Sequence, residues 1–96
     1  MAGMLADGLY ELTEIVRCGS VSAAASKLGL SQSAVSRHLL GLEAELGVTL
    51  LQRGIDGIAL TPEGRYAFMK GLEIAQEGEA LRLEIARLQC EPGMQA

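Results

Sequence analysis

The segment that most restricts the fold of this chain covers residues 21–37, with the sequence VSAAASKLGLSQSAVSR. Gly29 can adopt the left-handed backbone conformation that ends a helix. Ser31 is a good N-cap, because its hydroxyl accepts a hydrogen bond from a free amide of the following first turn. The segment therefore predicts two short helices joined by a tight turn. This is the helix-turn-helix arrangement, in which the second helix fits the major groove of DNA.

The helix predicted after Ser31 has two different faces. Its apolar residues recur at steps of four, three and four, which is typical of a face that packs on a core; they are Val35, Leu39, Leu42 and Leu46. A second face is mostly small and polar and consists of Gln32, Ser33, Ser36, Arg37 and Leu40. Ser and Gln side chains can read base edges, and an Arg guanidinium can pair with guanine or a phosphate. An ordinary solvated helix face remains the alternative.

Similar patterns predict the elements on either side. Apolar spacing, N-cap residues and glycines place the first three helices at about 5–18, 20–28 and 31–46. Two short strands follow at 49–53 and 58–60, joined by the turn residues of 54–57, and they predict a small β-hairpin. We therefore expect a mostly α fold, in which three helices and a hairpin wing form a winged helix-turn-helix, followed by a long linker helix.

The long helix is predicted to begin at Pro62, because Thr61 supplies a hydroxyl cap and Pro suits the first helical position. It continues to about Gln89, which gives ~28 residues and ~42 Å at 1.5 Å per residue. Aliphatic and small residues form two interleaved series with a period of seven: Ala67, Gly71, Ile74, Gly78, Leu81, Ile85 and Leu88. Such a heptad seam predicts pairing with a second copy in a homodimer. Packing of this stripe against its own domain is the alternative.

These expectations divide the chain into three parts. Residues 1–61 form the winged helix-turn-helix domain, 62–90 the linker dimerisation helix, and 91–96 a disordered tail. The net charge of −4 argues against a nucleic-acid partner, since such domains are usually basic. However, no acidic residue lies between Ile15 and Leu42, and the acids of the C-terminal segment lie away from the predicted reading helix.

Other classes of function find little support in the sequence. No apolar run approaches the roughly 20 residues that cross a bilayer, and no signal peptide precedes the domain, so we expect a cytoplasmic protein without membrane contact. Cys18 and Cys90 lack metal or redox spacing and are expected to be reduced thiols, with an intermolecular disulfide through Cys90 as the alternative. Together with His38 they are too few for a zinc site. We expect no enzymatic activity, cofactor or small-molecule site.

Short runs of residues between Leu9 and Gly64 occur in an order that resembles a known family. The runs are Gly19-Ser20, Ala23-Ala24-Ala25 with Leu28, Ser31 to Arg37, Leu42-Glu43 with Leu46-Gly47, Leu50-Leu51 with Arg53, and Leu60-Thr61 with Gly64. They resemble the N-terminal domain of LysR-type transcriptional regulators. The resemblance implies sequence-specific binding of double-stranded DNA, at the bacterial nucleoid, by a dimer paired through its linker helix. The family's effector-binding domain is expected to be missing from this chain.

The resemblance also assigns roles to individual residues. It implies that Gln32, Ser33, Ser36 and Arg37 are the DNA-contacting set of the recognition helix. Arg53 resembles the family's arginine at the base of the wing, which touches the phosphate backbone. Further candidates for phosphate contacts are Ser22, Lys27 and His38.

Two departures from the family pattern favour weaker DNA binding. Leu40 and Gly41 stand where the family often has basic residues, and the usually basic wing carries Ile55, Asp56 and Ala59. Each missing phosphate contact lowers both the affinity and its dependence on salt. An alternative function is therefore a protein-interaction module that pairs through its linker helix and has lost useful DNA affinity.

Overall fold

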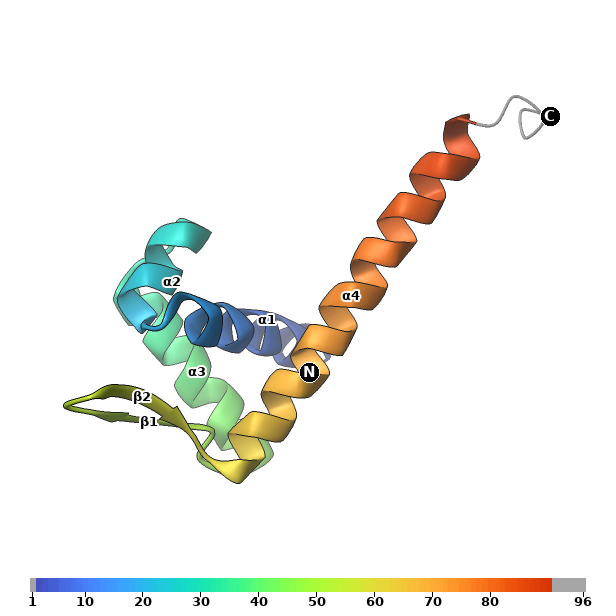
Figure 1. The fold of residues 1–96 in the computed structure, drawn as a ribbon. Helices are drawn as coiled ribbons and strands as arrows, with labels where there is room; N and C mark the ends of the chain where they lie inside the picture. Colours follow the sequence, from blue (N-terminus) through green and yellow to red (C-terminus); the bar gives the residue numbers. More distant parts are fainter. Residues whose placement is uncertain (1, 91–96) are drawn as a thin grey trace.

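A computed structural model describes residues 2–90, which form four helices and one two-stranded hairpin (Figure 1). In chain order these are α1 (Ala2–Cys18), α2 (Val21–Leu28), α3 (Gln32–Leu46), β1 (Leu51–Gly54), β2 (Gly57–Leu60) and α4 (Pro62–Cys90). The first three helices pack together, the hairpin projects beside α3, and most of α4 extends away from them (Figure 1). The predicted mostly α, winged helix-turn-helix fold is confirmed. The tail predicted at 91–96 lies outside the described residues.

The turn between α2 and α3 forms as its capping residues predict. Ser20 Oγ accepts a hydrogen bond from the Ala23 amide at 3.0 Å and begins α2. Gly29 ends this helix with a φ of 71°, in the left-handed region that favours glycine. Ser31 Oγ then accepts from the Ala34 amide at 3.1 Å and begins α3. The helix-turn-helix is therefore specified by local contacts at both of its ends.

The core lies where α1, α2 and α3 meet and is entirely aliphatic. Its most deeply buried side chains, at most 2% exposed, are Leu12, Ile15, Ala24, Ala25, Val35, Leu42 and Leu50. The small Ala24 and Ala25 side chains allow α2 to approach its neighbours closely. The prediction that Leu46 faces the core is wrong, since its side chain is 43% exposed. Leu46 lies in the last turn of α3 and lines an open groove with Val48 and Tyr66 instead.

The hairpin is antiparallel, with Leu51 opposite Leu60 and Arg53 opposite Ile58. Its first strand begins two residues later than predicted, because Thr49 and Leu50 bond to the start of α4. The Thr61 hydroxyl donates to the Thr49 carbonyl at 2.6 Å, and the Thr61 amide donates to the Leu50 carbonyl at 3.1 Å.

Two glycines allow α4 to pass close to the rest of the domain. Gly64 lies against the backbone of Leu50, and a Cβ atom at this position would lie 1.9 Å from the Leu50 carbonyl oxygen. At Gly71, where α4 crosses α1, a Cβ would lie 2.5 Å from Thr13 Oγ1. Both positions therefore require glycine, and they fix the root of α4 to the hairpin and to α1.

Candidate nucleic-acid interface

The outer face of α3 presents polar side chains around one guanidinium. Gln32, Ser33 and Arg37 are exposed, and Ser36 is half-buried beside them. Arg37 makes no hydrogen bond or ion pair within the part of the chain that the structure describes. Its side chain borders a hollow whose lining includes Asp7 of α1. The guanidinium is thus available to an external acceptor.

Side chains from two other elements bond to this face. Gln32 Nε2 donates to Ser22 Oγ of α2 at 3.0 Å, and Arg53 Nη2 of β1 donates to Ser36 Oγ at 2.9 Å. The fold thereby brings four of the predicted site residues together around the first half of α3. One pair joins the two helices of the helix-turn-helix, and the other joins the wing to the recognition helix.

Two further site candidates, Lys27 and His38, bond to buried acids of α1. Lys27 Nζ lies 2.9 Å from Glu14 Oε1, and His38 Nδ1 lies 2.8 Å from Glu11 Oε1. The hydrogen bond and the negative charge of Glu14 raise the pKa of Lys27 above its ordinary value of 10.5. Part of the positive charge expected near the recognition helix is therefore balanced within the domain.

The predicted dimerisation residues fall into two groups along α4. Ala67 is half-buried against the core and Gly71 is buried beside α1, so these two make contacts within their own chain. Further along, Ile74, Leu81 and Ile85 are 52%, 63% and 48% exposed. Nothing lies within 4 Å of a Cβ placed at Gly78, and Leu88 is half-buried. Within 2–90 the stripe therefore packs on its own domain only at its start.

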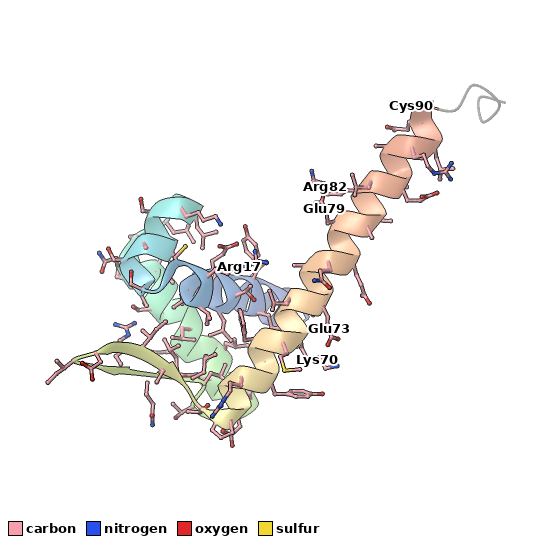
Figure 2. All side chains as sticks on the ribbon, viewed as in Figure 1. Arg17, Lys70, Glu73, Glu79, Arg82 and Cys90 are labelled. Atoms are coloured by element: carbon pink, nitrogen blue, oxygen red, sulfur yellow. The ribbon has the colours of Figure 1, made fainter. Side chains whose placement is uncertain are left out.

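Ion pairs occupy other positions of α4. Lys70 pairs with Glu73 at 3.3 Å, and Arg82 pairs with Glu79 at 3.8 Å on the part that projects beyond the domain (Figure 2). Each pair joins residues three apart on the helix surface.

The described residues contain neither a metal cluster nor a membrane helix. Within 2–90, no three His, Cys, Asp or Glu side chains converge closely enough to hold a metal ion. None of the helices over the same range combines the length and apolarity needed to cross a bilayer.

A family model described as the bacterial regulatory helix-turn-helix protein, lysR family, matches residues 7–65. The chain belongs to the LysR family. This confirms the predicted family, and the match covers α2, α3 and the wing, with the polar contacts of Gln32, Ser36, Lys27 and His38 described above.

Relatives of this LysR-family chain are named as transcriptional regulators. The HTH-type transcriptional activator BauR of Pseudomonas aeruginosa is 49% identical over 71 residues, which are 74% of this chain and 23% of BauR. The activator TtdR of Escherichia coli is 38% identical over 88 residues, which are 92% of this chain and 28% of TtdR. The chain thus spans about a quarter of the length of these curated relatives.

Solved structures of the LysR family share the fold. The BenM DBD in its crystal complex with catB site 1 DNA superposes with a TM-score of 0.82 at 28% identity. The alignment covers 90% of this chain and 97% of the BenM chain. The LysR-family chain therefore has the winged helix-turn-helix architecture of a DNA-binding domain.

The sequence-based reasoning missed the acidic partners within this LysR-family domain. Glu11 and Glu14 precede the acid-free segment in the sequence, but Glu14 bonds to Lys27 of α2 and Glu11 bonds to His38 of α3. The one signal was spacing, because Glu11 lies four residues before the core residue Ile15 and three before Glu14, so it adjoins both on the surface of α1. Buried acids are rarely left unpaired.

Proposed function

We propose that this chain binds double-stranded DNA in a sequence-specific manner, as a homodimer, and regulates transcription in the bacterial cytoplasm. Residues 1–61 serve as the DNA-binding domain and 62–90 as the linker dimerisation helix. The observation that carries this proposal is the outer face of α3, where Arg37 projects among hydroxyl and amide groups without a partner in the described chain. The DNA complex of the similar BenM domain supports it.

In this proposal the first half of α3 enters the major groove. Arg37 donates two hydrogen bonds to guanine or binds a phosphate, and Gln32 and Ser33 contact neighbouring base edges. Arg37 is well suited to this role because it breaks no bond within the described chain when it binds DNA. Ser22 and Arg53 hold the adjacent residues from α2 and the wing.

Dimerisation supplies the second reading helix. The exposed part of the stripe, from Ile74 to Leu88, is long enough to pack against the same segment of another copy. A two-fold dimer would place two α3 helices on two half-sites of the DNA. The proposal therefore predicts target sites made of two spaced half-sites.

Binding is expected to be weaker than that of a strongly basic domain. The net charge is −4, and Lys27 and His38 are engaged by Glu14 and Glu11. Few phosphates are neutralised, so few counterions are released, and the affinity falls less steeply with salt.

The decisive experiment is selection of binding sites from random duplexes at two salt concentrations, followed by the Arg37→Ala variant. We expect an enriched site with two half-sites, and binding of it that is weakened about tenfold or more by the loss of a base-reading arginine. Glu79→Gln is the control, because Glu79 lies on the projecting part of α4, far from α3 (Figure 2). Equal losses in both variants, or no enriched site, would contradict the proposal.

Exposed apolar side chains favour a second candidate, a protein-interaction module without useful DNA affinity. Leu40 on α3 is 65% exposed, and Ile55 at the tip of the wing is fully exposed. Neither side chain neutralises a phosphate. A mobility-shift assay at low salt that shows no complex with any promoter fragment would favour this candidate.

A further inference from the structure

We infer that Ser36 acts as a hydrogen-bond donor towards DNA, and that Arg53 is the positioning residue that imposes this direction. The inference rests on the proposed function, because it concerns how the α3 face reads a duplex. It adds to that function a chemical requirement on the DNA, namely an acceptor opposite Ser36.

The geometry begins at the wing. Arg53 lies in β1 opposite Ile58, and its exposed side chain extends from the hairpin to α3. There its Nη2 atom lies 2.9 Å from Ser36 Oγ. Ser36 lies one helical turn after Gln32 and directly before Arg37, within the predicted reading face.

The chemistry of the two groups fixes the direction of the bond. A guanidinium has only N–H donors, so Ser36 Oγ must be the acceptor in this contact. The hydroxyl keeps one proton of its own, and no residue in the described chain accepts it. Ser36 therefore offers a donor to whatever lies in front of α3.

This direction matters because an isolated serine is a poor reader of sequence. Its hydroxyl rotates and can either donate or accept, so it fits several base edges. Arg53 takes one of the two lone pairs of the Ser36 hydroxyl, and the free proton favours an acceptor: purine N7, guanine O6, thymine O4 or a phosphate oxygen. The amino group of cytosine, which only donates, is disfavoured as its partner, because it would leave the Ser36 proton without an acceptor.

Ser33 provides an internal contrast on the same face. Its hydroxyl lies 3.3 Å from Ser31 Oγ, and either oxygen can be the donor in that contact. The direction of the Ser33 hydroxyl is therefore not fixed. A comparison of Ser33 with Ser36 isolates the effect of the guanidinium from that of a hydroxyl as such.

The test uses the full chain and a duplex site obtained by selection, in which one acceptor at a time is removed. The analogues are 7-deazapurines for N7, 2-aminopurine for guanine O6, 5-methyl-2-pyrimidinone for thymine O4 and methylphosphonate for a phosphate. We expect one such replacement to weaken wild-type binding by about five- to tenfold, the size of one hydrogen bond. Ser36→Ala should weaken binding of the natural site similarly and be insensitive to that replacement.

Variants of Arg53 test its positioning role. In Arg53→Lys, the same replaced acceptor should still weaken DNA binding, because an ammonium also has only donors. In Arg53→Gln, the same replacement should weaken binding much less, because the amide oxygen can accept the Ser36 proton. The effects of Arg53→Gln and Ser36→Ala should be less than additive, whereas those of Arg53→Gln and Ser33→Ala should add.

Several results would overturn the inference. One is that each replaced acceptor lowers the DNA affinity of Arg53→Gln by the same factor as that of the wild type. Another is that the losses of affinity from Arg53→Gln and Ser36→Ala add fully in the double variant. If the wild type selects no duplex, both the proposed function and this inference fail. If it selects a site but Ser36→Ala binds as well as the wild type, only the inference fails. Thermal melting of each variant checks that the fold is retained.

Discussion

A single exposed side chain, Leu40, makes the third turn of α3 apolar on the face that we propose reads DNA. It lies four residues after Ser36 and three after Arg37, and 65% of its side chain is exposed. The LysR-family pattern often has a basic residue at this point, where a cation would reach a phosphate. An aliphatic side chain in that place removes one ionic contact without disturbing the fold.

Replacement of Leu40 by Arg should therefore strengthen DNA binding. One added phosphate contact should steepen the slope of log K against log salt by about 0.9. Fluorescence anisotropy titrations at several salt concentrations measure this slope. The matched control is Leu83→Arg, which adds the same charge at a 62% exposed position of α4. Equal slopes for the two variants would show that net charge, and not the position of Leu40, determines the change.

Residue-level predictions from the sequence succeeded where they depended on neighbours in the chain. The caps Ser31 and Gly29 act over three or four residues, so their roles could be predicted from the sequence. The partners of Lys27 and His38 lie 13 and 27 residues away on α1. Only the packing of α1 against α2 and α3 creates those pairs, and local patterns carry no information about it.

Among the elements, the junction between α3, the wing and α4 is held by hydrogen bonds to the backbone of Leu50 and Leu51. Glu43 Oε2 of α3 accepts hydrogen bonds from the amides of Leu50 at 2.7 Å and Leu51 at 3.2 Å. On the other side, Gly64 lies against the Leu50 carbonyl. The segment entering the wing is thus held between the recognition helix and the linker helix.

Gly64→Ala should loosen this junction and destabilise the protein. Its Cβ would overlap the Leu50 carbonyl oxygen, so the backbone must shift, at a cost of about 3 kcal/mol. Gly41→Ala is the control, because nothing lies within 4 Å of its Cβ and alanine favours a helix by about 0.5–1 kcal/mol. Chemical denaturation should show opposite signs for the two variants. Equal stabilities of Gly64→Ala and the wild type would contradict this account.

The helices and the hairpin could be predicted from the sequence because turn residues and apolar spacing mark their ends. The late start of β1 was not predictable, since Thr49 and Leu50 have strand-like side chains. Their carbonyl groups are instead used by Thr61, at the beginning of another element. A propensity for strand was overridden by a tertiary hydrogen bond.

At the scale of the whole molecule, the dominant feature is the projection of α4 from a small domain. The described part measures 57 × 26 × 21 Å and has a radius of gyration of 16.4 Å. A compact domain of about 100 residues would have a value near 13 Å. The larger radius of gyration reflects the outer part of α4, whose aliphatic residues are not covered by other described parts of the chain.

The dimer proposal can be tested with two leucines of equal exposure on this helix. Leu81 lies in the heptad stripe and is 63% exposed, whereas Leu83 lies on nearly the opposite side and is 62% exposed. Leu81→Glu should shift the protein towards monomers by placing charge in an apolar seam, and Leu83→Glu should not. Analytical ultracentrifugation over a range of concentrations measures the difference. Equal association of the two variants would contradict pairing through this stripe.

The heptad pattern predicted the stripe on α4. It did not predict which of its residues pack on their own domain and which remain exposed. Glycine permits close approach equally well to a helix of the same chain or of another. The structure shows that Gly71 packs on Thr13 of its own domain, while Gly78 has no neighbour among the described residues. The difference arises because α4 crosses α1 near Gly71 and then extends away from it (Figure 1).

The angle at which α4 packs at Gly64, near its first residue, also determines the position of its far end. Its 29 residues extend about 43 Å, so a pivot of about 10° at the base would displace Cys90 by about 7 Å. A displacement of that size is comparable to the length of two base-pair steps. In the proposed dimer, the close packing of Gly64 on Leu50 would hold α4 at a fixed angle and so determine the spacing of the two domains along a duplex.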